Sequence, residues 1–149
     1  AFVSPDGPMY QAGTLSGNPV AMAAGIAQLS ACLKPDFYTD LESETSYLIN
    51  KINHLAKDAK VPFSFFSIGS IFWIAFTTAK SIKAAAEIDA NSMVYFRQLH
   101  AYLLENGIYL GPSGYEVGFV SEAHTHEQLD KTANIFANGI LALQLQTQN

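Results

Sequence analysis

A glycine followed by a threonine, close to the start of the chain, is the first pair of residues that could bind a ligand. Gly13 and Thr14 lie within the run Met-Tyr-Gln-Ala-Gly-Thr-Leu-Ser-Gly-Asn-Pro of residues 9–19. A glycine lets the backbone approach a phosphate closely, and a threonine offers an N–H and a hydroxyl as donors. A plain loop leading into a helix would use the same residues. The residue types alone therefore leave two interpretations, a phosphate-binding turn and a helix-entry loop.

A single carboxylate, Glu116, is the second candidate for a functional role. It follows Tyr115 in the run Tyr-Leu-Gly-Pro-Ser-Gly-Tyr-Glu-Val-Gly-Phe of residues 109–119, whose glycines and proline indicate a turn. A carboxylate beside a binding pocket would repel an acidic group of a substrate. A glutamate in a turn, by contrast, is usually solvated at the protein surface. The sequence leaves both interpretations open.

Two histidines, His124 and His126, raise the question of a metal site, since histidine is a common metal ligand. A structural zinc site needs four ligands, and the single cysteine, Cys32, is distant in the sequence. Thr125 with Gln128 instead matches a capping box at the start of a helix. We therefore interpret this segment as helix capping and packing, and we predict no metal site.

Sequence signatures of a catalytic nucleophile are missing from the chain. In residues 13–17, Gly-Thr-Leu-Ser-Gly, the serine is displaced by one position from the G-x-S-x-G pattern. The sequence also contains no GxGxxG and no Walker motif. We therefore predict no catalytic residue within this chain.

The composition limits the class of protein. With 149 residues, 49% of them hydrophobic and 14% charged, the chain is long and apolar enough for a globular domain with a sizeable core. A net charge of -5 argues against a nucleic-acid partner, which demands a basic surface. No apolar run reaches the ~18–20 residues that a membrane span needs. A lone cysteine is compatible with a reducing compartment such as the cytoplasm, and the low charge fraction indicates apolar surface for a partner.

Residues 1–35 are predicted to form a loop and one helix. Asn18 before Pro19 is a favoured pair for the start of a helix, and Pro35 must follow its end. The run Val-Ala-Met-Ala-Ala-Gly-Ile-Ala of residues 20–27 is apolar on almost every side. A helix of this kind is expected to be buried on several sides, as a connector between two domains would be.

Residues 36–149 are predicted to form an α+β domain, in which a small antiparallel sheet is covered by helices. An amphipathic helix begins at Phe37, with its inward stripe at Tyr38, Leu41, Thr45, Leu48, Ile52 and Leu55. Strands are expected around 63–65 and 71–76, broken at Gly69-Ser70, and at 108–110 and 118–120. Further helices fit 91–105 and the segment after Thr125, whose stripe is Leu129, Ala133, Phe136, Ile140 and Leu143. Runs of strands between helices favour this fold class over a parallel doubly wound sheet.

The run of residues 9–19 resembles the Gly-Thr-x-x-Gly-Asn-Pro turn of class III, fold type I pyridoxal-phosphate aminotransferases. Its Gln-Ala-Gly-Thr and Ser-Gly-Asn-Pro parts are similar to the glutamate-1-semialdehyde aminomutase family in particular. Gly69-Ser70-Ile71-Phe72 and the Asn-Gly-Ile-Tyr-Leu run of residues 106–110 add to the resemblance, which covers nearly the whole chain. In that family the turn lies late in the polypeptide. The resemblance therefore implies that this chain is the C-terminal portion, with an N-terminal large domain outside it, and that it is catalytically inactive by itself.

The resemblance implies roles for three residues. Gly13 and Thr14 would bind the phosphate of pyridoxal or pyridoxamine phosphate held by the second subunit of a homodimer. Glu116 would lie in the loop beside a small-molecule substrate, glutamate-1-semialdehyde, which the intact enzyme converts to 5-aminolevulinate for tetrapyrrole synthesis. The family's cofactor-binding lysine occupies a glycine-rich strand end, a setting that none of the seven lysines here shares.

Two other interpretations are weighed against this one. The chain could be the small domain of another class III aminotransferase, which would use an arginine to hold a substrate carboxylate. Arg97, the only arginine, lies in the middle of a predicted helix and is poorly placed for that role. A non-catalytic α+β dimerisation module is the third possibility, and an upstream lysine-containing domain in the same reading frame would exclude it.

Overall fold

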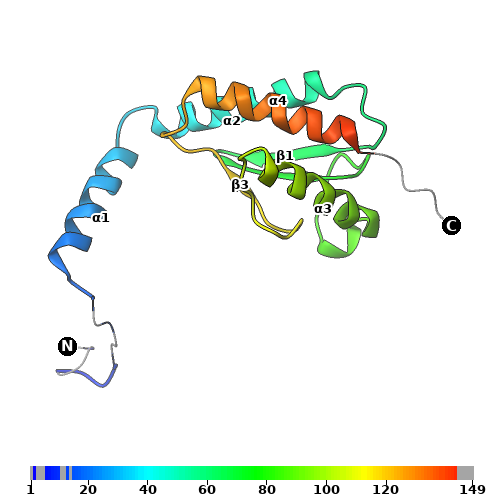
Figure 1. Ribbon diagram of the computed structural model, residues 1–149. Helices are drawn as coiled ribbons and strands as arrows, with labels where there is room; N and C mark the ends of the chain where they lie inside the picture. The colour runs from blue at the N-terminus through cyan, green and yellow to red at the C-terminus, as the bar shows by residue number, and fades with distance from the viewer. Residues whose placement is uncertain (1, 3–5, 11–12, 14, 144–149) are drawn as a thin grey trace. The chain divides into compact units, whose positions relative to one another are not determined.

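The computed structural model describes residues 2, 6–10, 13 and 15–143 (Figure 1). The chain divides into two compact units, Ala1–Phe37 and Tyr38–Asn149. The first unit contains helix α1 (Pro19–Cys32). Helix α2 (Phe37–Leu55) begins at the border, and the second unit contains the sheet and the helices that follow.

Helix α1 begins where the sequence predicts it. The Asn18 Oδ1 atom accepts hydrogen bonds from the backbone N–H groups of Val20, at 3.0 Å, and Ala21, at 3.2 Å. Two of the N–H groups that a helix start leaves without partners are thereby satisfied. Pro19 occupies the first helical position, where its missing N–H costs nothing. The predicted cap and boundary are confirmed.

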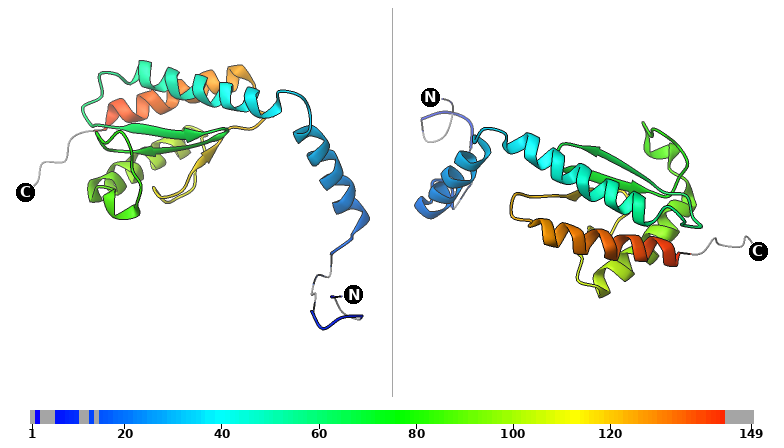
Figure 2. Two further views of the ribbon diagram at one scale, coloured as in Figure 1. Left: turned by 180° about the vertical axis from the view of Figure 1, so that it is seen from behind. Right: turned by 90° about the horizontal axis from the view of Figure 1, so that it is seen from above.

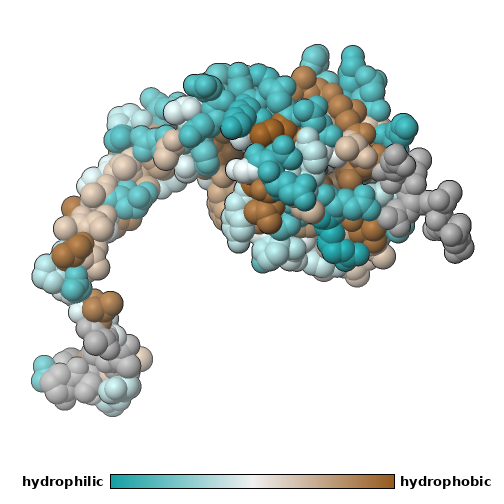
Figure 3. Space-filling model, in the orientation of Figure 1, coloured by the Kyte–Doolittle hydropathy of each residue, from teal (hydrophilic) through white to brown (hydrophobic). Residues whose placement is uncertain are grey.

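The predicted burial of α1 concerns packing against a domain outside this chain, and within the described chain none of the helix residues is buried. Its apolar side chains are instead strongly exposed, Val20 by 78% and Leu29 by 65%, for example. Figure 3 shows this apolar surface along the helix. Covering such a surface with protein is favourable by about 25 cal/mol per Å². The helix therefore has the amino-acid composition of a buried helix, although no part of the described chain covers its apolar side chains.

The second unit is built on a three-stranded antiparallel sheet in the order β1-β2-β3. Strands β1 (Ser64–Ile68) and β2 (Ile71–Ala75) form a hairpin, and β2 also pairs with the short β3 (Gly118–Phe119). Gly69 turns the hairpin with a φ of 55°, a conformation that glycine adopts without strain. Both predicted strands and the break between them are confirmed.

Helices α2 and α4 (His126–Ala142) lie side by side on one face of the sheet (Figures 1 and 2). Phe136 of α4 joins the layers, since its ring centroid lies 6.0 Å from that of Phe65 and 6.5 Å from that of Phe72. The core around it is completed from α2, β2, α3 and α4 by Leu48, Ile52, Ile74, Leu99, Leu103, Leu129 and Ile140. The predicted inward stripe of α4 is confirmed, with all five residues buried.

Helix α3 (Ala90–Glu105) packs closely against α4. A Cβ atom at Gly139 of α4 would lie 2.7 Å from Tyr102 Cδ1 and 2.8 Å from Leu99 Cδ1. Only a glycine permits this approach. A capping box of Thr125 and Gln128 starts α4, as the sequence predicts. No helix among the described residues is both long and apolar enough to span a membrane.

Two sequence predictions in this unit are wrong. Residues 108–110 are not a strand, because their backbone bonds to α3 and not to β3. The Ile108 N–H donates to the Leu103 carbonyl at 2.8 Å, and His100 Nε2 donates to the Leu110 carbonyl at 3.2 Å. Tyr38, predicted to face inward on α2, is 67% exposed.

A cluster of polar side chains joins α2 to α4. The Lys51 Nζ atom lies 2.5 Å from Asp130 Oδ1 and 3.2 Å from the Tyr47 hydroxyl, which itself donates to Asp130. Hydrogen bonds from Lys51 and, to a smaller extent, from Tyr47 lower the pKa of Asp130. The pKa of Lys51 is raised mainly by its hydrogen bond to Asp130, and further by the one to Tyr47. Both charged forms are therefore favoured in the folded state.

Replacing Asp130 with asparagine is expected to lower stability at neutral pH, with a pH dependence that follows from these shifts. The pKa of Asp130 is lower in the folded than in the unfolded chain, so its contribution is present above the unfolded carboxyl pKa. The contribution is lost as the pH falls through the folded pKa, and the two proteins should converge there. Urea unfolding between pH 2.5 and 7 measures this, with Asp58→Asn as the exposed control that removes the same charge. A difference independent of pH would contradict the interpretation.

Candidate functional site

The candidate phosphate-binding turn is described in part. Gly13 is exposed, and its carbonyl accepts a hydrogen bond from the Ser16 N–H at 3.0 Å. The Asn18 N–H donates to the Leu15 carbonyl, also at 3.0 Å, so two consecutive turns lead into α1. Gly17 between them has a φ of 75°. The predicted partner of Gly13, Thr14, lies outside the described residues.

The second candidate segment is the loop of residues 111–118, which three contacts fix to the domain. The Trp73 indole N–H donates to the Gly114 carbonyl at 2.7 Å. A Cβ atom at Gly114 would lie 2.8 Å from Met93 Sδ, and one at Gly118 would lie 2.3 Å from Phe72 Cζ. The loop therefore rests directly on β2 and α3. The sequence analysis did not predict this role of Trp73. The only available signal was that Trp73 is the single tryptophan of the chain.

Glu116 lies on the surface of this loop. Its backbone N–H closes a turn by donating to the Ser113 carbonyl at 3.0 Å. Its side chain lies across Gly111, where an added Cβ atom would be only 1.8 Å from Glu116 Oε2. The residue is exposed. The carboxylate therefore has a defined position and is open to a ligand.

Exposed apolar side chains lie along this loop and the strand that follows it. Tyr115, Val117 and Phe119 are exposed by 59%, 41% and 62%, whereas Gly118 and Val120 are buried. From Val117 to Val120 exposed and buried residues alternate, as in a strand with one exposed face. The loop therefore combines a carboxylate with an apolar, partly aromatic surface.

The histidines serve packing and capping among the described residues. His124 Nδ1 accepts from the Ser121 N–H at 2.9 Å. The His126 ring lies over Tyr47, with 4.2 Å between centroids, and its Nδ1 is 3.3 Å from Glu44 Oε2. Within the described ranges, no group of three or more His, Cys, Asp or Glu residues is arranged to hold a metal ion.

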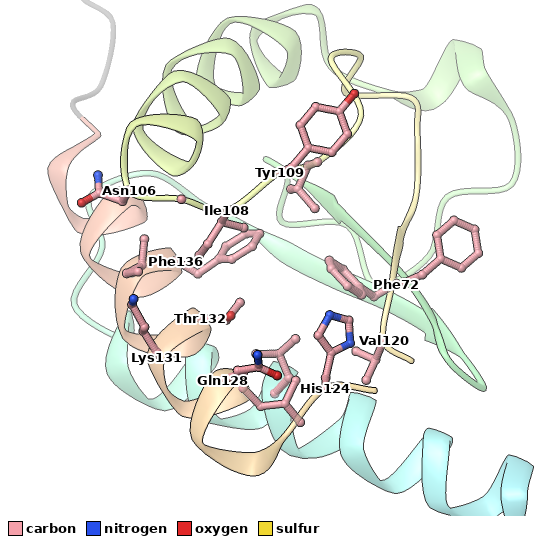
Figure 4. A pocket seen from close by; sticks show the side chains of 16 residues that line it. Phe72, Asn106, Ile108, Tyr109, Val120, His124, Gln128, Lys131, Thr132 and Phe136 are labelled. Atoms are coloured by element: carbon pink, nitrogen blue, oxygen red, sulfur yellow. The ribbon is translucent and has the colours of Figure 1, made fainter. Parts of the chain in front are cut away.

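A groove of about 480 Å³ opens beside β3 (Figure 4). Ile108 and Tyr109 come from one side of it, Val120 and His124 from the other, and Gln128, Lys131 and Thr132 from α4. Phe72 and Phe136 lie between the two sides. The sequence pattern did not indicate this groove, because it predicted that residues 108–110 and 118–120 were two short strands flanking one turn.

The two candidate segments belong to different units, since Gly13 lies in the first and Glu116 in the second.

Comparison with known proteins adds information that the geometry does not contain. No protein-family model matches the chain. The glutamate-1-semialdehyde 2,1-aminomutase of Francisella tularensis subsp. holarctica (strain FTNF002-00 / FTA) is 41% identical over 131 residues, which are 87% of this chain and 30% of that protein. Over this matched part, the chain is similar to the C-terminal portion of the glutamate-1-semialdehyde aminomutases. It spans less than a third of the length of the curated relatives that it matches.

Solved structures show the fold of the chain. A transaminase with PLP bound is 26% identical, with a TM-score of 0.68 over 90% of this chain and 30% of that one. A glutamate-1-semialdehyde aminomutase from Pseudomonas aeruginosa PAO1 gives a TM-score of 0.68 at 19% identity, over 91% and 30%, and a variant of it was solved in complex with PMP. The predicted fold, the C-terminal small domain of a fold type I enzyme, is confirmed.

Proposed function

We propose that this chain is the C-terminal part of a glutamate-1-semialdehyde 2,1-aminomutase. In the full-length protein it would take part in converting glutamate-1-semialdehyde to 5-aminolevulinate, by moving an amino group between neighbouring carbons. The observation that carries the proposal is the 41% identity over 87% of the chain to an aminomutase. Arg97 is the only arginine in the sequence, and it is exposed on α3. This favours an aminomutase over an aminotransferase that needs an arginine from this domain to bind its substrate.

The proposed cofactor is pyridoxal phosphate or pyridoxamine phosphate, which supplies an electron sink for amino transfer when bound. The turn around Gly13 fits a phosphate in two respects. Its glycine backbone is exposed, and the sequence has no charged side chain between Asp6 and Lys34. No carboxylate within that stretch would therefore repel the phosphate. We assign Gly13 and Thr14 to phosphate binding across a homodimer interface.

The proposed organisation assigns residues 1–35 to the phosphate-binding turn and a connector helix, and residues 36–149 to the small domain. The partners of the first segment would be an N-terminal large domain and the second subunit. The exposed apolar side chains of α1 support this assignment, because burying them requires surface from another part of the protein. The cofactor-binding lysine would come from the large domain, and we place the protein in the cytoplasm.

Glu116 is proposed to select the substrate by charge. Its position across Gly111 keeps the carboxylate on the exposed side of a loop that Trp73 holds. A fixed carboxylate there repels a substrate whose own carboxylate lies beside the reacting carbon. It does not repel a semialdehyde in the same way, since that compound presents an aldehyde at this end. The adjacent apolar side chains of Tyr115 and Val117 would exclude water from the carbon chain.

Replacing Glu116 with glutamine in the full-length protein is expected to lower aminomutase turnover more than cofactor affinity. The substitution keeps the size and removes the charge, so transamination with dicarboxylic amino acids should increase. Turnover, cofactor affinity and transamination are measured on the same preparation. The control is Glu105→Gln, an equal charge change on the exposed end of α3, which should alter none of the three. If Glu116→Gln behaves as this control does, Glu116 is an ordinary turn residue.

A further inference from the structure

The groove beside β3 lies between two lengths of backbone that do not pair with each other. On one side is β3, the edge strand of the sheet, and on the other are residues 108–110. Figure 4 shows the two segments on either side of the opening, with Phe72 and Phe136 between them. In an antiparallel sheet, neighbouring strands pair through their backbones at a spacing of about 4.8 Å. Here the place beside β3 is open.

The outer edge of β3 offers free backbone groups to that opening. Val120 lies opposite Ser70, and the Val120 N–H donates to the Ser70 carbonyl at 2.9 Å. Hydrogen-bonded and non-hydrogen-bonded pairs alternate along antiparallel strands. Phe119, one residue earlier and opposite Ile71, is therefore in a non-hydrogen-bonded pair. Its N–H and C=O point away from β2, toward the groove.

The opposite side of the groove is the segment of residues 108–110, which is held at both ends by α3. Ile108 donates to Leu103, and the Leu110 carbonyl accepts from His100, which leaves Tyr109 between two anchored neighbours. The sequence Ile-Tyr-Leu of residues 108–110 has strong strand propensity. These residues therefore have the composition and the fixed ends of a strand, and none of the described strands pairs with them.

We propose that the groove accepts an extended polypeptide segment, which pairs with Phe119 on one side and with Tyr109 on the other. Its apolar side chains would contact Phe72 and Phe136 at alternate positions. An acidic residue of the segment would lie near Lys131, since Lys131 and His124 line the groove and no carboxylate does. The added strand would extend the three-stranded sheet beneath α4 and convert residues 108–110 into a further strand.

The segment comes from the part of the full-length protein outside this chain. The curated relatives contain more than twice as much further polypeptide as the matched part, because the match covers 30% of their length. A strand from the same polypeptide is also held at high effective concentration. The assignment of the inserted segment to the same polypeptide rests on one part of the proposed function, namely that this chain is part of a longer protein.

Hydrogen exchange at the amides of Phe119 and Tyr109 tests the proposal, measured in the full-length protein and in the 149-residue chain. Both amides should exchange ~100-fold or more slowly in the full-length protein, and rapidly in the shorter chain. Equal rates in the two would overturn the proposal. Slow exchange in the short chain that strengthens with concentration would also overturn it, since a second copy would then occupy the groove.

The variant Phe119→Pro separates the two edges of β3. It removes the N–H that points into the groove and retains the Val120–Ser70 bond on the β2 side. In the full-length protein it should abolish the protection of Tyr109, whereas Phe119→Ala, which keeps the N–H of an exposed residue, should not. Protection of Tyr109 that survives Phe119→Pro would contradict strand addition. Neither readout measures amino transfer, so the groove and the proposed function fail or succeed separately.

Discussion

Replacing Thr14 with valine in the full-length protein is expected to raise the dissociation constant for pyridoxal phosphate by roughly ten- to a hundredfold. Valine keeps the shape of threonine and removes the hydroxyl that would donate to a dianionic phosphate. Such a charge-assisted hydrogen bond contributes ~1.5–3 kcal/mol. Equilibrium titration of the apoprotein with the cofactor measures the change. Thr78→Val, at an exposed threonine after β2, is the matched control and should leave the affinity unchanged.

The same variant also tests whether the turn acts in trans. In the proposed homodimer, mixed dimers would combine the Thr14→Val subunit with a subunit that retains Thr14 and lacks the proposed cofactor-binding lysine. One of the two sites then combines an intact lysine with an intact turn from the neighbouring subunit. Tight cofactor binding should return at half the sites. If mixing restores nothing while the Thr14→Val homodimer binds weakly, the turn serves its own subunit.

Replacing Phe136 with alanine is expected to have the largest effect on stability. The side chain is fully buried, and its ring packs against Phe65 and Phe72 where α4 meets the sheet. Truncating a buried phenylalanine costs about 3–5 kcal/mol, from lost apolar burial and the cavity that is left. This is a large fraction of the ~5–15 kcal/mol that stabilises a typical domain. Urea unfolding of the 149-residue chain measures the loss.

Phe119→Ala provides the comparison for that measurement. It makes the same chemical change at a side chain that is 62% exposed, so little apolar surface returns to water. Its effect on the unfolding midpoint should be much smaller than that of Phe136→Ala. Equal losses would mean that Phe136 is not at the centre of the core.

The sequence predicted those elements whose local pattern and tertiary environment agree. The capping box of Thr125 and Gln128 and the apolar stripe of α4 both appear where the spacing placed them, because short-range hydrogen bonds and one buried face specify that helix. The β1–β2 hairpin was equally predictable, since Gly69 supplies the turn between two strand-forming segments.

Predictions failed where an element depends on a neighbour that the local pattern does not contain. Residues 108–110 have strand composition and still do not form a strand, because their backbone bonds to α3 and none of the described strands pairs with them. The burial expected for α1 depends on a domain outside this chain, and its apolar side chains have no covering surface in the described chain. Both segments present surfaces that we assign to the rest of the full-length protein.

The sequence was enough to select the candidate site residues, but it did not predict how they are positioned in the structure. Motif similarity selected Gly13, Thr14 and Glu116, and the roles of all three stay predictions. The contacts that position Glu116 came only from the structure. The indole of Trp73, 41 residues away from Gly114 in sequence, holds the loop through a backbone carbonyl that any residue could supply. No residue-type pattern encodes such a contact.

Production of 5-aminolevulinate from glutamate-1-semialdehyde by the full-length protein, with no added amino donor or acceptor, tests the proposed function most directly. An aminomutase returns the amino group to the same carbon skeleton, so no second substrate is consumed. We predict sustained conversion under these conditions, with no 2-oxo acid released. The contradicting result is a protein that leaves glutamate-1-semialdehyde unchanged and transfers amino groups only when a separate amine and a keto acid are both supplied. Such a protein would be an ordinary class III aminotransferase.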